Sequence, residues 1–262
     1  MAEYSSFLEQ RNGTGEPGGA FPHRERWLER ANAAAVRYGG EVPVDTLARH
    51  PRDVGDPCLR ALMAFVKINA GEAYGVEAVG RARHSRPLTD APLDRVERLL
   101  LQEEQYHTRI LAGAANQFGL SPPASAYRAP LATRVLIGTL VHAPEAFFHP
   151  VLLAAEVGGL FLFNWLLQQV ARRFTGELRE SLEARLIEIM IDEIGHVAFN
   201  RVAVGPLGIE VGRVLAPEVA HSTAGMLPEL KSLGWSRDTL RQFDGFSLKS
   251  LPEAARRSAF FV

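Results

Sequence analysis

Two Glu-x-x-His tetrads, Glu104-x-x-His107 and Glu193-x-x-His196, restrict the fold of this chain more than any other feature. Residues three positions apart share one face of an α-helix, so each tetrad offers a carboxylate oxygen and an imidazole nitrogen to one cation. Two such helices that face each other form a cage for two metal ions when further carboxylates complete it. The sequence therefore predicts long helices that pack together through buried acids.

Two more acids, Glu72 and Glu156, each lie on a helix-like segment one element before a tetrad. Glu156 is surrounded by Leu, Ala and Val, and an ionised carboxylate there costs several kcal/mol unless a partner compensates it. In antiparallel hairpins, the two acids of each pair lie equally far from the connecting turn, whereas Glu77 does not match. We predict a dinuclear site with the ligands Glu72, Glu104, His107, Glu156, Glu193 and His196.

Three residues next to the ligands are candidates for supporting roles. Glu103 and Asp192 directly precede the acids of the two tetrads and suit hydrogen bonding to a ligand histidine, with plain surface acidity as the alternative. Tyr106, inside the first tetrad, is placed in the same supporting group. A third Glu-x-x-His, formed by Glu218 and His221, follows a proline at the start of a segment, and we interpret it as a chance match.

Proline and glycine positions divide the chain into segments that are predicted to be helical, and no alternating run of strand type interrupts them. The expected helices span 24–38, 57–84, 92–119, 131–141, 150–174 and 175–200, with a proline-rich crossover before residue 131. Residues 1–21 suit a flexible arm, and residues 22–262 a single domain. Its ligand-bearing bundle covers about 57–200, and the tail 206–262 is expected to pack on it in short pieces.

Composition excludes several classes of function. The net charge of -1, with scattered Lys and Arg, argues against a nucleic-acid partner. The single cysteine, Cys58, cannot form an internal disulfide, and residues 1–10 contain acids and no apolar core, so a cytoplasmic location is expected. Residues 151–170 are apolar and long enough to span a bilayer. Glu156 and Asn164 interrupt them, so a buried bundle helix is the preferred interpretation over a membrane span.

The order Glu, Glu-x-x-His, Glu, Glu-x-x-His resembles the ferritin-like di-iron carboxylate proteins over about residues 57–200. The resemblance implies an all-α, ferritin-like four-helix bundle with a long crossover and extra short helices at both ends. It further implies two iron ions, with manganese as the alternative metal, and O₂ as co-substrate. Glu104 and Glu193 would bridge the metals, and Glu72 and Glu156 would be terminal ligands.

Within that superfamily the tetrads look most like oxygenases, including bacterial multicomponent hydroxylases and the p-aminobenzoate N-oxygenase type. Three positions depart from relatives: Leu111 stands where the ribonucleotide reductase subunit has a radical-forming Tyr, Ile189 where the N-oxygenases have an extra His, and Gly195 where the hydroxylases usually have Arg. A stable tyrosyl radical at position 111 is therefore excluded, and carbon hydroxylation and N-oxygenation stay unranked.

The expected activity is that of an O₂-dependent di-iron monooxygenase acting on a small organic substrate, free or carrier-bound, with an external electron donor. Glycines beside the ligands, Gly71, Gly75, Gly158 and Gly159, leave room for a substrate or allow close helix packing. The alternatives are a ferroxidase or other iron-handling protein and a metal-free helical scaffold. A homodimer is compatible with the sequence.

Overall fold

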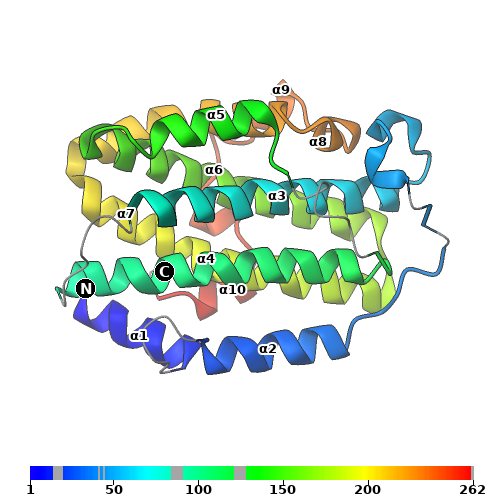
Figure 1. Ribbon diagram of the computed structural model, residues 1–262, viewed down its shortest axis with the longest axis horizontal. Coiled ribbons are helices and arrows are strands. Elements are labelled where there is room, and N and C mark those ends of the chain that lie inside the picture. Colours follow the sequence, from blue (N-terminus) through cyan, green and yellow to red (C-terminus); the bar gives the residue numbers. More distant parts are fainter. Residues whose placement is uncertain (14–19, 41, 44, 84–90, 121–127, 261–262) are drawn as a thin grey trace.

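The chain is all-α in the computed structural model, which describes residues 1–13, 20–40, 42–43, 45–83, 91–120 and 128–260. Helices run along the long axis of the molecule, and no strand is present in the described ranges (Figure 1). The principal helices are α1 (Ala2–Asn12), α2 (Pro22–Ala33), α3 (Pro57–Arg83), α4 (Pro92–Asn116), α5 (Leu131–Leu140), α6 (Glu145–Arg173) and α7 (Gly176–Gly225). Shorter ones are η1 (Thr46–Ala48), η2 (Pro51–Asp53), α8 (Pro228–Ser232), α9 (Arg237–Arg241), η4 (Leu248–Ser250) and α10 (Glu253–Ser258).

The long helices pack in two pairs, α3 with α4 and α6 with α7, and the pairs meet through contacts of α4 with α7 and of α3 with α6. Their facing sides supply most of a single large apolar core. The bounds of α3, α4 and α5 follow the proline positions closely, because Pro57 and Pro92 occupy first helical turns, where a missing backbone N–H costs nothing. The proline-rich crossover at 121–127 lies outside the described residues.

The prediction that Pro150 begins the third long helix was wrong. Helix α6 begins one turn earlier, at Glu145, and Pro150 lies inside it. A proline so near an N-terminus removes at most one intrahelical hydrogen bond, so the preceding residues still join the helix. Phe147 is mostly exposed on this added turn.

The prediction that the fourth helix stops near Asn200 and leaves an irregular tail was also wrong over 201–225. Gly205 has φ 65 and ψ -176, a left-handed conformation that glycine adopts without strain, and the helix restarts at Pro206. A residue before proline disfavours the helical region, which explains why the break falls there. Two helical segments, 176–204 and 206–225, therefore follow each other, and the second turns away from the first (Figure 1).

The expected loose arm at 1–21 contains a packed helix. Residues 2–12 form α1, whose Tyr4 and Leu8 are buried with Val96, Leu100 and Phe199 in a small second core cluster. The glycine-rich part, 14–19, lies outside the described residues. The composition of that stretch gave the whole segment the appearance of a linker, although the ten residues before it carry apolar side chains at helical spacing.

Helix α6 is long and apolar enough to cross a membrane, by length and composition only, and half of its most apolar window is buried within the protein. It packs along α7, and Leu160, Phe163 and Leu166 belong to the main core. Near its middle, Phe161 and Trp165 contact aromatic side chains of the C-terminal segment, including Trp235. The tail after α7 thus covers one face of α6.

Candidate metal centre

Ligand-type atoms of Glu104, Glu156, Glu193 and His196 all lie within 4.8 Å of one another, the one such group of potential metal ligands in the described part of the chain. Three helices contribute: α4 carries Glu104, α6 carries Glu156, and α7 carries the other two. The Nδ1 atom of His196 lies 2.7 Å from Oε1 of Glu104 and 4.0 Å from Oε2 of Glu156. The hairpin of α6 and α7 therefore brings Glu156 and Glu193 to one level, as the sequence predicted.

His107 forms a second half of the same centre. Its Nδ1 lies 3.4 Å from Oε2 of Glu104 and 3.3 Å from Oε1 of Glu193, and its ring lies 5.5 Å from that of His196 between centroids. Two ligands bound at right angles to one cation at about 2.1 Å stand about 3 Å apart. These spacings suit shared coordination, and Glu104, which contacts both histidines through different oxygens, is positioned between two metal positions.

The second ring nitrogen of each histidine, Nε2, contacts a carboxylate outside the inner group of acids. Nε2 of His107 lies 3.2 Å from Oδ2 of Asp192, and Nε2 of His196 lies 3.2 Å from Oε2 of Glu103. A carboxylate accepts a hydrogen bond from Nε2–H, so the lone pair of a neutral imidazole is at Nδ1 and points toward the acids of the centre. Glu103 and Asp192 thus occupy the supporting positions predicted for them.

One buried polar atom tests whether the residues fit a metal. Nδ1 of His107 is buried and has no hydrogen-bond partner, although two carboxylate oxygens lie within 3.4 Å of it. Lone pairs on nitrogen and oxygen repel one another at this distance unless a cation lies between them. A proton or a metal ion satisfies the arrangement, and the poor hydrogen-bond geometry favours a metal ion. The donor set of imidazole nitrogens and carboxylate oxygens suits first-row divalent metals.

The four inner carboxylates are those of Glu72, Glu104, Glu156 and Glu193, and no Lys or Arg in the described part of the chain forms an ion pair with them. Among the described residues, the ion pairs of Glu104, Glu156 and Glu193 are all with His107 or His196. Burial, together with the charges of Glu104 and Glu193, raises the pKa of Glu72 to about 8. Burial and the same two acids raise the pKa of Glu156 well above its usual range. Such mutual repulsion is what two divalent cations would relieve.

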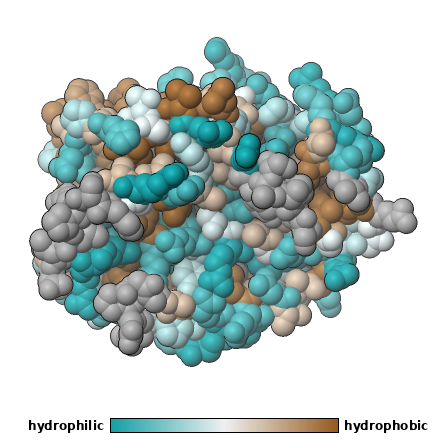
Figure 2. Space-filling model, viewed as in Figure 1, coloured by the Kyte–Doolittle hydropathy of each residue, from teal (hydrophilic) through white to brown (hydrophobic). Residues whose placement is uncertain are grey.

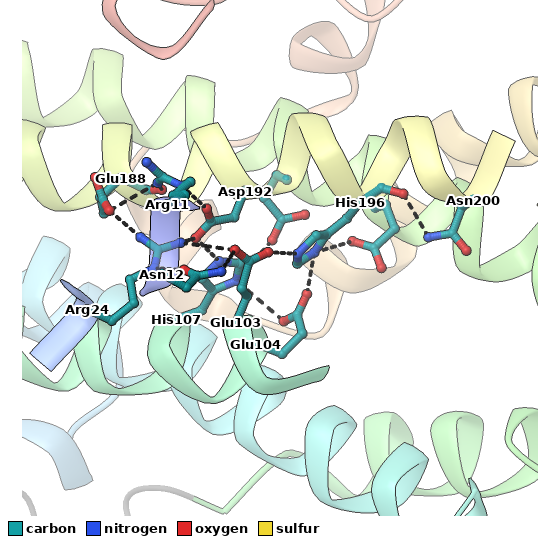
Figure 3. A network of polar contacts seen from close by, with 12 residues as sticks. Arg11, Asn12, Arg24, Glu103, Glu104, His107, Glu188, Asp192, His196 and Asn200 are labelled. Atoms are coloured by element: carbon teal, nitrogen blue, oxygen red, sulfur yellow. Dashed lines mark hydrogen bonds and ion pairs between the residues drawn. The ribbon is translucent and has the colours of Figure 1, made fainter. Parts of the chain in front are cut away.

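The outer carboxylates are neutralised by the N-terminal helices, which sequence analysis had left without a role. Arg24 of α2 is buried and pairs with Asp192 and Glu188, and its guanidinium also lies 3.4 Å from Glu103 (Figure 3). Arg11 of α1 donates from Nε to Oδ1 of Asp192 at 2.9 Å. Both arginines approach the back of the histidines from the side opposite the inner acids.

Asn12 completes this outer layer. Its Nδ2 donates to Oε1 of Glu103 at 2.7 Å, and its Oδ1 accepts from Nε of Arg24 at 2.7 Å. The histidine supports are therefore fixed by side chains from a segment far away in sequence. No local sequence motif identifies such residues.

Several sequence candidates lie elsewhere. The hydroxyl of Tyr106 donates to Glu25 and accepts from the backbone N–H of Phe21, so this side chain anchors α2 rather than contacting the inner acids. Glu77 is 61% exposed and pairs with Arg81 on the same helix. Glu218 and His221, on the second segment of α7, are not members of the metal-ligand group.

A cavity of about 540 Å³ opens beside the centre. Its wall includes Glu72, Glu104, Glu156, Glu193 and His196 at one end, and otherwise consists mainly of apolar side chains from α3 to α7. Gly71, Gly75 and Gly159 all line it, and a Cβ added at Gly71 or Gly159 would meet no other atom within 4 Å. Gly158 instead allows Ala220 of α7 to approach closely. Thus three of the four glycines leave space and one serves helix packing.

No family model, curated protein or solved structure matches this chain. Its function is therefore inferred from the geometry of its own residues.

Glu72 and Glu77 provide a direct test of the ligand set. We expect Glu72→Gln to lower metal affinity by at least tenfold, because its carboxylate lies in the wall of the centre. Glu77→Gln should leave metal content unchanged, since that side chain is exposed. Metal analysis of both purified variants after identical loading decides the matter. Loss of metal in the Glu77 variant alone would show that the other face of α3 binds it.

Proposed function

We propose that this protein is a non-haem di-iron oxygenase with a ferritin-like four-helix bundle formed by α3, α4, α6 and the first segment of α7. It would use O₂ to hydroxylate or N-oxygenate a small organic substrate, with electrons from an external donor. The observation that carries the proposal is the convergence of three carboxylates and two imidazole Nδ1 atoms, with the carboxylate of Glu72 in the wall of the adjoining cavity and no Lys or Arg ion pair to these acids among the described residues.

The residues divide into three roles. Glu104 and Glu193 would bridge the two metal positions, Glu72 and Glu156 would complete them, and each histidine would bind through Nδ1. Bound iron would supply the electrons and the Lewis acidity for O₂ activation. Asp192 and Glu103 orient the imidazoles. The charges of Arg24 and Arg11 hold the pKa of Asp192 well below its usual range, so this carboxylate stays ionised and preserves the correct tautomer of His107.

The cavity favours an oxygenase over a ferroxidase. An iron-storing protein needs a polar route for ferrous ions, whereas the wall of this cavity is mostly apolar, with side chains such as Ile137 and Phe148. Its polar residues outside the centre, which include Lys67, Glu97 and Glu218, are a minority. Its volume lies within the range of about 300–1,000 Å³ that holds small organic ligands. Asn200, in the same wall, donates to the backbone oxygen of His196 and leaves its buried Oδ1 without a partner, which suits a hydrogen-bond donor on the substrate.

Metal analysis combined with O₂ reactivity tests the proposal. We expect two irons per chain and, after anaerobic reduction, consumption of O₂ that is coupled to oxygenation of an organic compound from a panel of small amines and hydrocarbons. A protein that oxidises many added ferrous ions per chain without such product would be a ferroxidase. A folded protein that binds no iron would instead be a scaffold.

Filling the cavity should separate substrate binding from metal binding. We expect Gly159→Leu to keep both metals and to lower product formation by about 100-fold, because displacing a substrate by about 1 Å is enough for such a loss. Oxidation of added ferrous ions should be unaffected. The matched control is Gly80→Leu, at a helical glycine that also faces open space but is outside the cavity lining. Equal activity in both variants would place the substrate elsewhere.

A further inference from the structure

Helix α5 has an unusual position for so apolar a segment, because none of its residues is buried. Leu131 is 72% exposed and Val135 is 61% exposed, and both line a shallow groove along the outer side of the helix. Phe147, at the start of α6, follows the C-terminal end of α5 and is also exposed. Apolar side chains gather on the upper edge of the molecule, where α5 lies (Figure 2). A helix this apolar is normally covered on most of its surface.

The contacts that hold α5 in place are sparse. The hydroxyl of Tyr74 on α3 donates to the backbone oxygen of Arg134 at 3.3 Å, and the hydroxyl of Thr133 lies 3.4 Å from the sulfur of Met226. On its inner side, Ile137 and Leu140 line the cavity that leads to the metal centre. Helix α5 thus lies over the cavity as a cover with two apolar sides.

The charges around α5 indicate which kind of partner covers its exposed side. Residues 128–144 include Arg128, Arg134 and His142 and contain no Asp or Glu. Glu145, at the start of α6, is the first acid that follows. An apolar helix whose own segment carries only basic charges matches the pattern of helices that lie in the headgroup region of an anionic bilayer. A two-fold contact with a second copy of the chain would instead bring like cations such as Arg134 toward one another. The charge pattern therefore favours lipid over self-association.

The outer groove and the inner cavity share one lining residue. Leu136 lines both, and it is half-exposed, so moving this one side chain would connect the outer surface with the cavity. A lipid surface at this point would deliver apolar molecules directly to the cavity, without transfer through water.

We propose that α5, together with Phe147, is a docking face for an anionic lipid surface and the entrance for an apolar substrate. Docking itself requires no metal, whereas the role as an entrance rests on the proposed oxygenase function. The substrate class is thereby narrowed to apolar compounds that partition into lipid.

Vesicle binding tests the docking face. Metal-free protein is sedimented with vesicles of phosphatidylcholine alone and with vesicles that also contain phosphatidylglycerol. We expect binding to the anionic vesicles, about fivefold weaker in Arg134→Gln. It should fall by tenfold or more in the double variant Leu131→Ser with Val135→Ser. Both changes are at exposed positions, and circular dichroism verifies the fold. The control is Leu248→Ser, an exposed leucine far along the chain.

Each outcome is decisive. No binding by folded wild-type protein, or full binding by the double variant, overturns the proposal. If analytical ultracentrifugation instead shows a dimer that the double variant abolishes, and vesicles do not bind, the face is an interface between two copies. Because the assay needs neither iron nor turnover, its failure leaves the oxygenase proposal intact, and absence of iron leaves the docking result intact.

Discussion

Replacing Glu156 with Gln is expected to remove most of the bound metal and, at the same time, to stabilise the metal-free protein. Burial and the charges of Glu193 and Glu104 raise the pKa of Glu156 above its unfolded value, so ionisation opposes folding at neutral pH. Gln cannot ionise, and we expect the free energy of unfolding to rise by about 1–3 kcal/mol at neutral pH. The gain should disappear below the ordinary Glu pKa of about 4.3, where the unfolded carboxyl is also neutral.

Metal affinity is measured to check the expected loss of metal. Urea unfolding of the metal-free forms at neutral and acidic pH checks the expected gain in stability. Loss of a direct ligand should lower affinity by more than about 100-fold, which exceeds the usual effect of a supporting residue. Glu77→Gln, at an exposed acid, is the control and should change neither quantity. A full metal complement in the Glu156 variant would remove it from the ligand set. Unchanged stability would mean that another cation already compensates this carboxylate.

A buried acid such as Glu156 destabilises the metal-free fold, and this cost makes the acid conspicuous in the sequence. For that reason the acids and histidines of the centre could be predicted from the sequence. Glu156 stands out because an acid between Leu, Ala and Val contradicts the pattern of its own helix, and such a conflict is retained only where something compensates the charge. The Glu-x-x-His spacing then fixes which face of each helix turns inward. Periodicity and spacing are local properties, so the chain displays them without an alignment.

The outer part of the site could not be predicted in the same way. Arg24, Arg11 and Asn12 reach Asp192 and Glu103 from helices that lie at least 79 positions away in sequence. Their partners are set by how α1 and α2 pack on α4, which no local pattern encodes. The kinked continuation of α7 was missed for a related reason. Gly205-Pro206 looks like an end, and only packing decides whether a helix resumes after it.

Loss of Arg24 should have the largest effect on stability of any single change in the N-terminal helices. This buried guanidinium pairs with Asp192 and Glu188 and approaches Glu103, so Arg24→Gln removes one of the two arginines that pair with Asp192 and Glu188 and leaves only Arg11 beside them. Removing one partner of a buried ion pair costs about 3–5 kcal/mol. Metal affinity should fall by about 10–100-fold as well, because the carboxylates that orient the two histidines lose their own support.

Two comparisons separate these effects. Arg109→Gln removes a surface pair with Glu25 and should cost less than about 1 kcal/mol, which controls for loss of any arginine. Adding Asp192→Asn to Arg24→Gln should recover part of the stability, because a buried carboxylate that has lost one of its two arginine partners is then removed. It should not recover metal affinity, because an amide no longer fixes the proton on Nε2 of His107. If the double variant regained both, Arg24 would act on folding alone; if it regained neither, buried charge would not be the cause of the instability.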